Sequence, residues 1–105
     1  MKKVFCVFAL LLSLLGAKES VELQEGKEAY KRGDYKRAFE LFERACESRE
    51  AEGCSNLASM YDKGEGVKKN KAKAMQLFQK ACDSGDMGIC ILLGIIYEDM
   101  EQSSF

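Results

Sequence analysis

A pair of cysteines separated by eight residues occurs twice in this chain, as Cys46 with Cys54 and, 36 residues later, as Cys82 with Cys90. The residues around the two pairs repeat in the same register: Ala38 recurs as Ala74, Leu41 as Leu77, Phe42 as Phe78, Ala45 as Ala81, Leu57 as Leu93 and Tyr61 as Tyr97. A fixed period of this length is typical of a solenoid, in which one supersecondary unit stacks on copies of itself. The repeat therefore predicts an architecture directly, whereas it says little about an activity.

The spacing of apolar residues predicts five helices, at about 20–32, 35–47, 50–63, 71–83 and 86–99, followed by a tail without readable structure. Within each helix the apolar residues recur three or four positions apart, so they share one face. Asp34, Ser48 and Asn70 are expected to cap the helices that follow them, because their side chains can accept hydrogen bonds from free backbone amides. The short connections predict that consecutive helices pack as antiparallel neighbours.

Small and aromatic residues recur at matched places in the units. The small residues are expected to let neighbouring backbones approach closely, and they are Ala45, Ala58, Ala81 and Gly94. Three tyrosines at corresponding positions are expected to pack in the core, and they are Tyr30, Tyr61 and Tyr97. Both expectations follow from the stacking of similar units, in which the same contact is made once per repeat.

The first seventeen residues have the features of a secretory signal peptide. Lys2 and Lys3 precede an apolar run at 4–15, and Gly16 and Ala17 are small residues suited to cleavage after Ala17. Twelve apolar residues are too few for a comfortable membrane span. We therefore expect an exported protein, periplasmic or secreted, with no membrane association after cleavage. The predicted domain organisation is a signal peptide at 1–17, a repeat domain at 18–100 with units at about 20–47, 48–83 and 84–99, and a tail at 101–105.

Export determines how the cysteines are interpreted. Cys6 would leave with the signal peptide, and four cysteines would remain, an even number in an oxidising compartment. Four cysteines allow three pairings, and the repeat selects the one that keeps each bridge inside its own unit. The predicted disulfides are therefore Cys46–Cys54 and Cys82–Cys90.

Composition excludes several classes of function. The net charge is −1, so there is no basic excess to indicate nucleic acid binding, and the chain contains no histidine. Imidazole-based zinc sites and a histidine general base are therefore excluded. Neither a cofactor nor a metal ion is predicted.

The glycine loop and the flanking stripes resemble a known repeat. The pattern begins with Tyr61, Gly64, Gly66 and Val67, continues with the stripe of Ala74, Leu77, Phe78 and Ala81, and ends with Leu93, Gly94 and Tyr97. It is similar to the Sel1-like repeat, a relative of the tetratricopeptide helix pair. Cysteine pairs at eight-residue spacing behind a signal peptide resemble the Helicobacter cysteine-rich (Hcp) proteins. The resemblance implies an all-α, right-handed α-solenoid of antiparallel helix pairs. Met100 and Gln102 replace the loop glycines after the last helix, so we expect a shortened member of the family.

The same resemblance implies a penicillin-binding protein with slow β-lactamase activity, a hydrolase connected with antibiotic resistance. Serine β-lactamases use a Ser-x-x-Lys pair. None of the serines Ser20, Ser48, Ser55, Ser59 and Ser84 has a lysine three residues after it. We therefore assign no catalytic residue, and enzyme activity remains an implication of the resemblance alone.

The leading hypothesis is a module that binds a protein or peptide, since stacked helix pairs form a concave surface that holds extended ligands. The ligand could be derived from the cell wall or resemble a β-lactam. Asn56 and Tyr61 are the candidate ligand-surface residues, although an exposed amide and a packed tyrosine are the simpler interpretations. In addition, Ile91, Ile95 and Ile96 cannot all face the preceding helix, so self-association through them is expected unless a further unit covers them.

Overall fold

The structure is a computed structural model that describes residues 19–103, so the predicted signal peptide and Cys6 lie outside the described residues. The described residues form five helices and no strand: α2 (Val21–Lys31), α3 (Tyr35–Glu47), α4 (Ala51–Lys63), α5 (Lys71–Asp83) and α6 (Met87–Ser103). The all-helical prediction is confirmed, and the bounds of α3 and α5 are those expected. Among these residues, no helix is long and apolar enough to cross a membrane.

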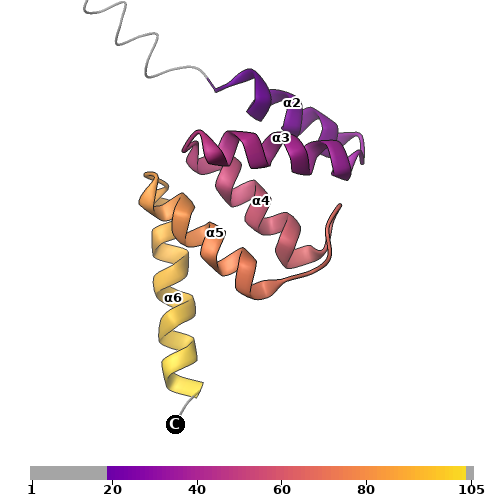
Figure 1. Cartoon of the computed structure of the whole chain (residues 1–105). Coiled ribbons are helices and arrows are strands. Elements are labelled where there is room, and N and C mark those ends of the chain that lie inside the picture. Colours follow the sequence, from indigo (N-terminus) through magenta and orange to yellow (C-terminus); the bar gives the residue numbers. More distant parts are fainter. Residues whose placement is uncertain (1–18, 104–105) are drawn as a thin grey trace, which may run out of the picture.

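Each helix packs chiefly on its neighbours in the chain, so α2 to α6 form a single stack (Figure 1). The helices begin at side chains that accept a backbone hydrogen bond. Ser20 accepts from the amide of Leu23, and Asp34 and Asn70 accept from the amides three residues after them. These caps satisfy amides that the first helical turn leaves free, which explains why these helices start where the sequence predicted.

Two predicted helix ends are wrong. Ser48 does not cap α4, because it forms the C-terminal cap of α3, and α4 starts after Glu50 without a side-chain cap. Arg49, the next residue, has a positive φ of 63°, so the helical backbone conformation does not continue from Ser48 into α4. In addition, α6 continues to Ser103 although its predicted end was Asp99.

The extension of α6 has a local cause. The equivalent helix α4 ends at Gly64, which adopts a left-handed backbone conformation. Glycine adopts this conformation without strain because it has no Cβ. Met100 occupies the matching position in α6, and a residue with a Cβ favours the right-handed helical region instead. The helix therefore continues through 101–103, where the sequence predicted an unstructured tail.

The core lies along the stripe that the repeat predicts. Buried side chains in α3 and α4 are the main part of one cluster, with a smaller contribution from α2 and α5: Leu23, Ala29, Ala38, Phe42, Ala45, Cys46, Cys54, Leu57, Ala58, Met60, Leu77 and Ala81. The rings of Phe39 and Tyr61 meet edge to face at 5.5 Å beside it. The middle of the stack is therefore better packed than its C-terminal end.

Two of the matched positions in α6 are not packed as predicted. Gly94 is exposed, with no neighbouring heavy atom within 4 Å of a built Cβ, and Tyr97 is 45% exposed. Their equivalents in α4 are Ala58, which is fully buried, and the half-buried Tyr61. The difference arises because α4 packs between α3 and α5, whereas among the described helices α6 packs on α5.

A different glycine provides the close approach between helices. A Cβ built on Gly53 of α4 would lie 2.6 Å from the Cβ of Ala45 and 3.1 Å from two backbone atoms of α3. Real Cβ atoms do not approach one another so closely, so only glycine fits at this crossing. The repeat could not indicate this, because the equivalent residue in the second unit is Ile89.

Candidate functional site

A groove of about 330 Å³ lies between α2 and α4. Its lining combines aromatic, amide, hydroxyl and charged side chains: Lys27, Tyr30 and Lys31 from α2, Phe42 from α3, and Glu52, Asn56, Ser59 and Lys63 from α4. Asn56 was proposed from the sequence as a ligand-surface residue and lies in this lining. Tyr61, the second candidate, is not among the lining residues and packs against Phe39.

Polar contacts connect α2 to the start of α4 and to the loop after it. Ser20 donates from Oγ to the carboxylate of Glu50 at 2.9 Å. The Lys27 ammonium forms ion pairs with Glu19, at 2.8 Å, and with Glu52. Glu50 precedes α4 and Glu52 lies in its first turn and lines the groove, so these contacts hold α2 against the N-terminal part of α4.

The charge of Lys27 is neutralised within the protein. Hydrogen bonds to Glu19 and then to Glu52 raise the pKa of Lys27 above its usual 10.5, against the smaller opposing effect of burial. The cation is therefore retained at all physiological pH values and is already paired. By contrast, Lys31 and Lys63 are exposed and make no ion pair with a described residue.

Tyr30, which also lines the groove, is hydrogen-bonded to the glycine loop after α4. Tyr30 donates from its hydroxyl to the Glu65 carboxylate, at 2.8 and 3.0 Å from the two oxygens. Gly66, the next residue, has a φ of 70°, and a Cβ there would lie 2.7 Å from the carbonyl oxygen of Tyr35. The loop therefore lies directly against the first residue of α3, where only glycine fits.

The Tyr30–Glu65 bond gives a pH dependence with a defined sign. The hydrogen bond to Glu65, followed by burial, raises the pKa of Tyr30 above its usual 10.0. A group whose pKa is raised on folding stabilises the fold below its unfolded pKa, and this stabilisation is lost as the pH rises through the folded value. We expect Tyr30→Phe to cost about 1 kcal/mol at pH 8 and to cost nothing once the phenol is ionised.

Urea unfolding of the wild type and of Tyr30→Phe at pH 8 and at pH 11.5 measures this difference. The raised pKa of Lys27 produces a loss of the same sign in both proteins, so the comparison isolates the tyrosine. An absorbance titration of the phenolate at 295 nm should lose its latest-titrating component in the variant. A constant difference in stability at both pH values would show that the bond does not respond to ionisation.

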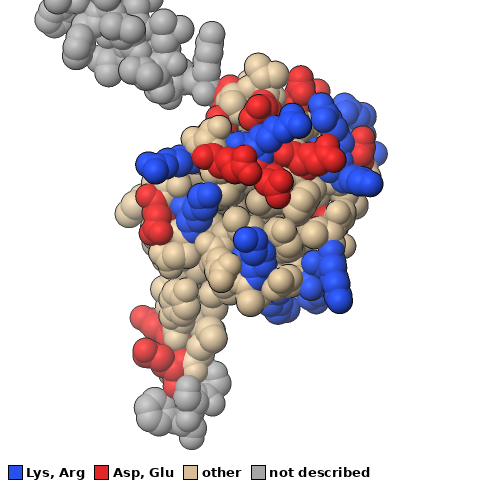
Figure 2. Space-filling view, viewed as in Figure 1, with Lys and Arg blue, Asp and Glu red and all other residues tan. Residues whose placement is uncertain are grey.

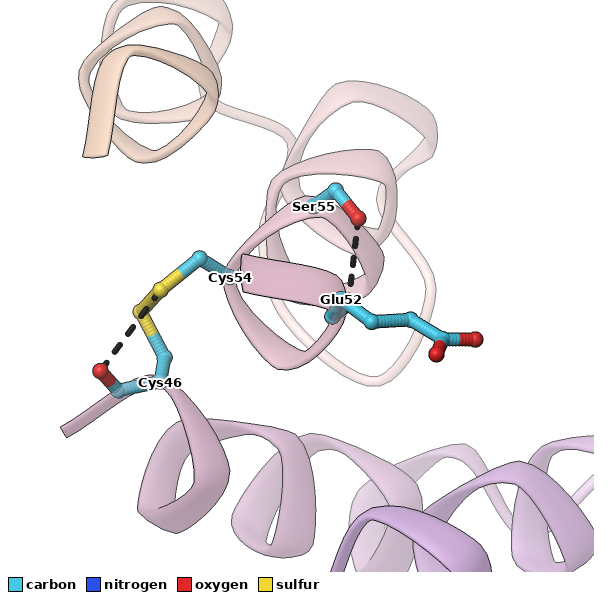
Figure 3. Close-up of a disulfide and its surroundings, with 4 residues drawn as sticks. All are labelled: Cys46, Glu52, Cys54 and Ser55. Carbon is cyan, nitrogen blue, oxygen red and sulfur yellow. Dashed lines mark hydrogen bonds between the residues drawn. A yellow bond between two sulfur atoms is a disulfide. The ribbon is translucent and has the colours of Figure 1, made fainter. Parts of the chain in front are cut away.

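A disulfide joins the N-terminal part of α4 to the end of α3 (Figure 3). Cys46, at the end of α3, is bonded to Cys54, in the first turns of α4, with 4.4 Å between their Cα atoms. The Cys54 sulfur also lies 3.6 Å from the carbonyl oxygen of Cys46. This is a close contact and not a hydrogen bond, because a bridged sulfur has no proton to donate. Both cysteines are buried.

The second predicted disulfide is also present. Cys82 and Cys90 are joined at the α5–α6 turn, with a Cα separation of 4.8 Å. These cysteines are only half-buried, in contrast to the first pair. Among the described residues no group of histidine, cysteine and carboxylate side chains is arranged to hold a metal ion.

Comparison with known proteins gives a consistent assignment. The Sel1 repeat pattern matches residues 12–49 and 51–86. The chain is 43% identical over 75 residues to "Putative beta-lactamase HcpC" of Helicobacter pylori and 37% identical over 76 residues to "Putative beta-lactamase HcpD" of the same organism. These alignments cover 68% and 69% of this chain but 25% of each relative, so the chain spans about a quarter of their length.

A relative that matches a shorter part of the chain comes from an animal. The "Cytochrome c oxidase assembly factor 7 homolog" of Drosophila melanogaster is 44% identical over 41 residues, which is 39% of this chain and 15% of that protein. The names of the relatives therefore differ. The family match covers more than half of the sequence and agrees with the all-helical stack, so this chain belongs to the Sel1 repeat family and is related to the Hcp proteins of Helicobacter pylori.

Proposed function

We propose that this chain is an exported binding module that holds an extended segment of another protein in the groove between α2 and α4. The groove itself carries the proposal, because it is open and is lined by side chains from both α2 and α4. Sel1 repeats generally mediate protein–protein interactions. Stacked helix pairs suit this role because they present a continuous surface longer than a single pocket.

The lining favours a particular peptide chemistry. Phe42 and Tyr30 offer apolar surface, and Asn56 and Ser59 offer an amide and a hydroxyl that can pair with a peptide backbone. Lys27 is already paired, so the free positive charge at the groove comes from the exposed Lys31 and Lys63. The groove therefore fits an extended segment that carries a carboxylate next to an apolar side chain.

Selection from a random octapeptide library on the oxidised protein tests this function. We expect enrichment of peptides with Asp or Glu beside an aliphatic or aromatic residue. The double variant Lys31→Glu with Lys63→Glu should then bind the selected peptides at least tenfold more weakly, because each peptide carboxylate loses an attractive charge and gains a repulsive one. Fluorescence anisotropy of a labelled selected peptide gives the dissociation constants.

A matched charge change provides the control. Lys68→Glu with Lys69→Glu alters the net charge by the same amount, but these residues lie in the exposed connection before α5 and do not line the groove. This control should change the affinity by less than threefold at physiological salt. Equal losses in both double variants would mean that net charge drives binding, and the groove would then not be the site.

Hydrolysis of a β-lactam is a second candidate function, drawn from the names of the relatives. Ser59 and Lys63 lie one turn apart in the groove lining, and no hydrogen bond joins them among the described residues. A chromogenic β-lactam added to the same preparations separates the two functions. Turnover that disappears in Ser59→Ala while peptide binding is retained would favour the hydrolase.

Export is supported by the signal-like segment and by the two disulfides, which form in oxidising compartments. We propose a periplasmic or secreted location, with cleavage after Ala17. The intact mass of the protein recovered outside the cytoplasm tests both points. A mass that includes the first seventeen residues would contradict the cleavage.

A further inference from the structure

Two segments that are distant in the sequence place positive charge at one end of the molecule. Residues 31–37, where the chain turns from α2 into α3, contribute Lys31, Arg32, Lys36 and Arg37. Residues 62–73, from the end of α4 through the glycine loop into α5, contribute Lys63, Lys68, Lys69, Lys71 and Lys73. All nine are exposed, and we call them the basic end. Figure 2 shows Lys and Arg side chains on the right of the molecule, at the α2–α3 turn above and at the connection between α4 and α5 below.

Contacts hold the two segments against each other. A Cβ built on Gly66 would lie 2.7 Å from the carbonyl oxygen of Tyr35, so the glycine loop lies on the start of α3. The Tyr30 hydroxyl donates to Glu65 at 2.8 Å, and the rings of Tyr30 and Tyr35 lie 5.0 Å apart. The two sets of cations therefore occupy neighbouring positions of the fold, within reach of one extended ligand.

Most of these cations have no ion-pair partner. Arg37 lies 3.8 Å from Glu40, and Lys71 lies 4.0 Å from Asp62, with all four side chains exposed. Exposed pairs of this kind contribute little to stability. The other seven cations of the basic end form no ion pair with a described residue. The basic end is therefore not a network of ion pairs that stabilises the fold.

The carboxylates within the two segments are already engaged. Asp34 accepts a hydrogen bond from the amide of Arg37, Glu65 accepts one from Tyr30, and Asp62 lies beside Lys71. Nine cations against these three carboxylates give the two segments a net charge of +6, in a chain whose net charge is −1. Glu28 and Glu40, one turn away along α2 and α3, reduce the local value only to +4.

The composition of the basic end favours one kind of anionic ligand. Unpaired cations at neighbouring positions repel one another, and a bound anion removes this repulsion. Among the described residues, no large hydrophobic side chain of either segment is exposed, so there is nothing to insert into a membrane. Tyr30 and Tyr35 are half-buried and pack on each other, so no open ring is available to stack on a nucleic acid base. An acidic peptide chain requires neither feature.

We propose that the basic end binds a run of aspartate or glutamate residues in a protein partner, adjoining the segment that lies in the groove. Lys31 and Lys63 belong both to the basic end and to the groove lining, so a chain that leaves the groove there meets the remaining cations. The choice of a protein as the ligand rests on the proposed function, whereas the attraction for carboxylates rests on the charges alone. Such exposed charges supply mainly a faster encounter and a salt-dependent affinity.

Fluorescence anisotropy of a labelled peptide of ten glutamates, added to the oxidised full chain, tests this site. The wild type should bind it at 25 mM sodium chloride and should bind at least fivefold more weakly at 250 mM, because salt screens exposed charges. Lys68→Glu with Lys69→Glu should weaken binding at least tenfold, and so should Arg32→Glu with Lys36→Glu, because the ligand contacts both segments. A peptide of ten glutamines should not bind.

Arg44→Glu with Lys80→Glu is the matched control. These exposed residues lie in the last turns of α3 and α5, away from the basic end, and the change in net charge is the same. The control should weaken binding less than threefold. Equal losses in all three double variants, or no binding by the wild type at 25 mM salt, would overturn the proposal. A DNA strand with ten phosphates that binds more than tenfold more tightly than the glutamate peptide would also overturn it.

The glutamate peptide and the selected octapeptides are separate probes, so each result can fail alone. If no octapeptide is selected while the glutamate peptide binds at the basic end, the groove function fails and this site stands. If the octapeptides bind and respond to the groove variants while the glutamate peptide does not bind, the groove function stands and this site fails.

Discussion

Reduction of both disulfides is expected to unfold most of the chain at 37 °C. Each bridge closes a loop of nine residues (46 to 54 and 82 to 90) and contributes about 2.5 kcal/mol by loop entropy. The two together approach the whole stability of a domain of this size, about 5–10 kcal/mol. Thermal unfolding followed by circular dichroism should therefore show a melting temperature lowered by roughly 20 °C or more in excess reductant.

The two bridges should not contribute equally. Cys46 and Cys54 are buried in the core, so replacing both by alanine should destabilise α3 and α4 and with them the whole stack. Replacing Cys82 and Cys90 should mainly release α6, because those cysteines are half-buried and α6 packs on one described helix. Hydrogen exchange of the backbone amides distinguishes global from local loss. An unchanged melting curve after complete reduction would show that packing alone holds the helices.

The substitution Gly53→Ala is expected to destabilise the fold, although alanine is the better helix former by about 1 kcal/mol. The added Cβ would lie 2.6 Å from the Cβ of Ala45 and 3.1 Å from backbone atoms of Ala45 and Cys46. Backbone atoms cannot move aside as a flexible side chain can, so the two helices must separate. Overpacking of this kind costs about 1–3 kcal/mol, which outweighs the gain in helix propensity.

The substitution Gly94→Ala is expected to have the opposite effect on stability in the same fold. Gly94 also lies inside a helix, but no neighbouring atom is within 4 Å of a Cβ built there. This substitution should stabilise the chain by about 0.5–1 kcal/mol through propensity alone. Urea unfolding of both variants gives the two free energies. A stabilised Gly53→Ala protein would mean that the α3–α4 crossing is looser than the structure shows.

Local patterns predicted the helices well where the chain provides both a stripe and a cap. The bounds of α3 and α5 follow from their alanine, leucine and phenylalanine spacing and from Asp34 and Asn70. The cap of α4 was assigned wrongly to Ser48, because Arg49 adopts a positive φ without being glycine and Ser48 ends α3 instead. A signal existed, since the 36-residue period aligns Arg49 with Gly85, whose φ is 111°.

The groove could be predicted only in part. Asn56 was identified because an amide on a solenoid surface suits a peptide backbone, but Lys27, Tyr30 and Glu52 were not. Their roles depend on contacts between residues 25 to 35 positions apart, such as the bond from Tyr30 to Glu65. No periodicity in the sequence records how α2 crosses over α4, so the site required the structure.

The covalent links have a consequence for the ligand groove. α3 and α4 share one disulfide and α5 and α6 share the other, so among the described helices α2 alone carries no cysteine. One wall of the groove is therefore anchored by a covalent bond, while the other is held by packing and by hydrogen bonds that water can replace. The position of this unanchored wall therefore depends on its packing against α3, through buried residues such as Leu23 and Ala29, and not on the oxidation state of the protein.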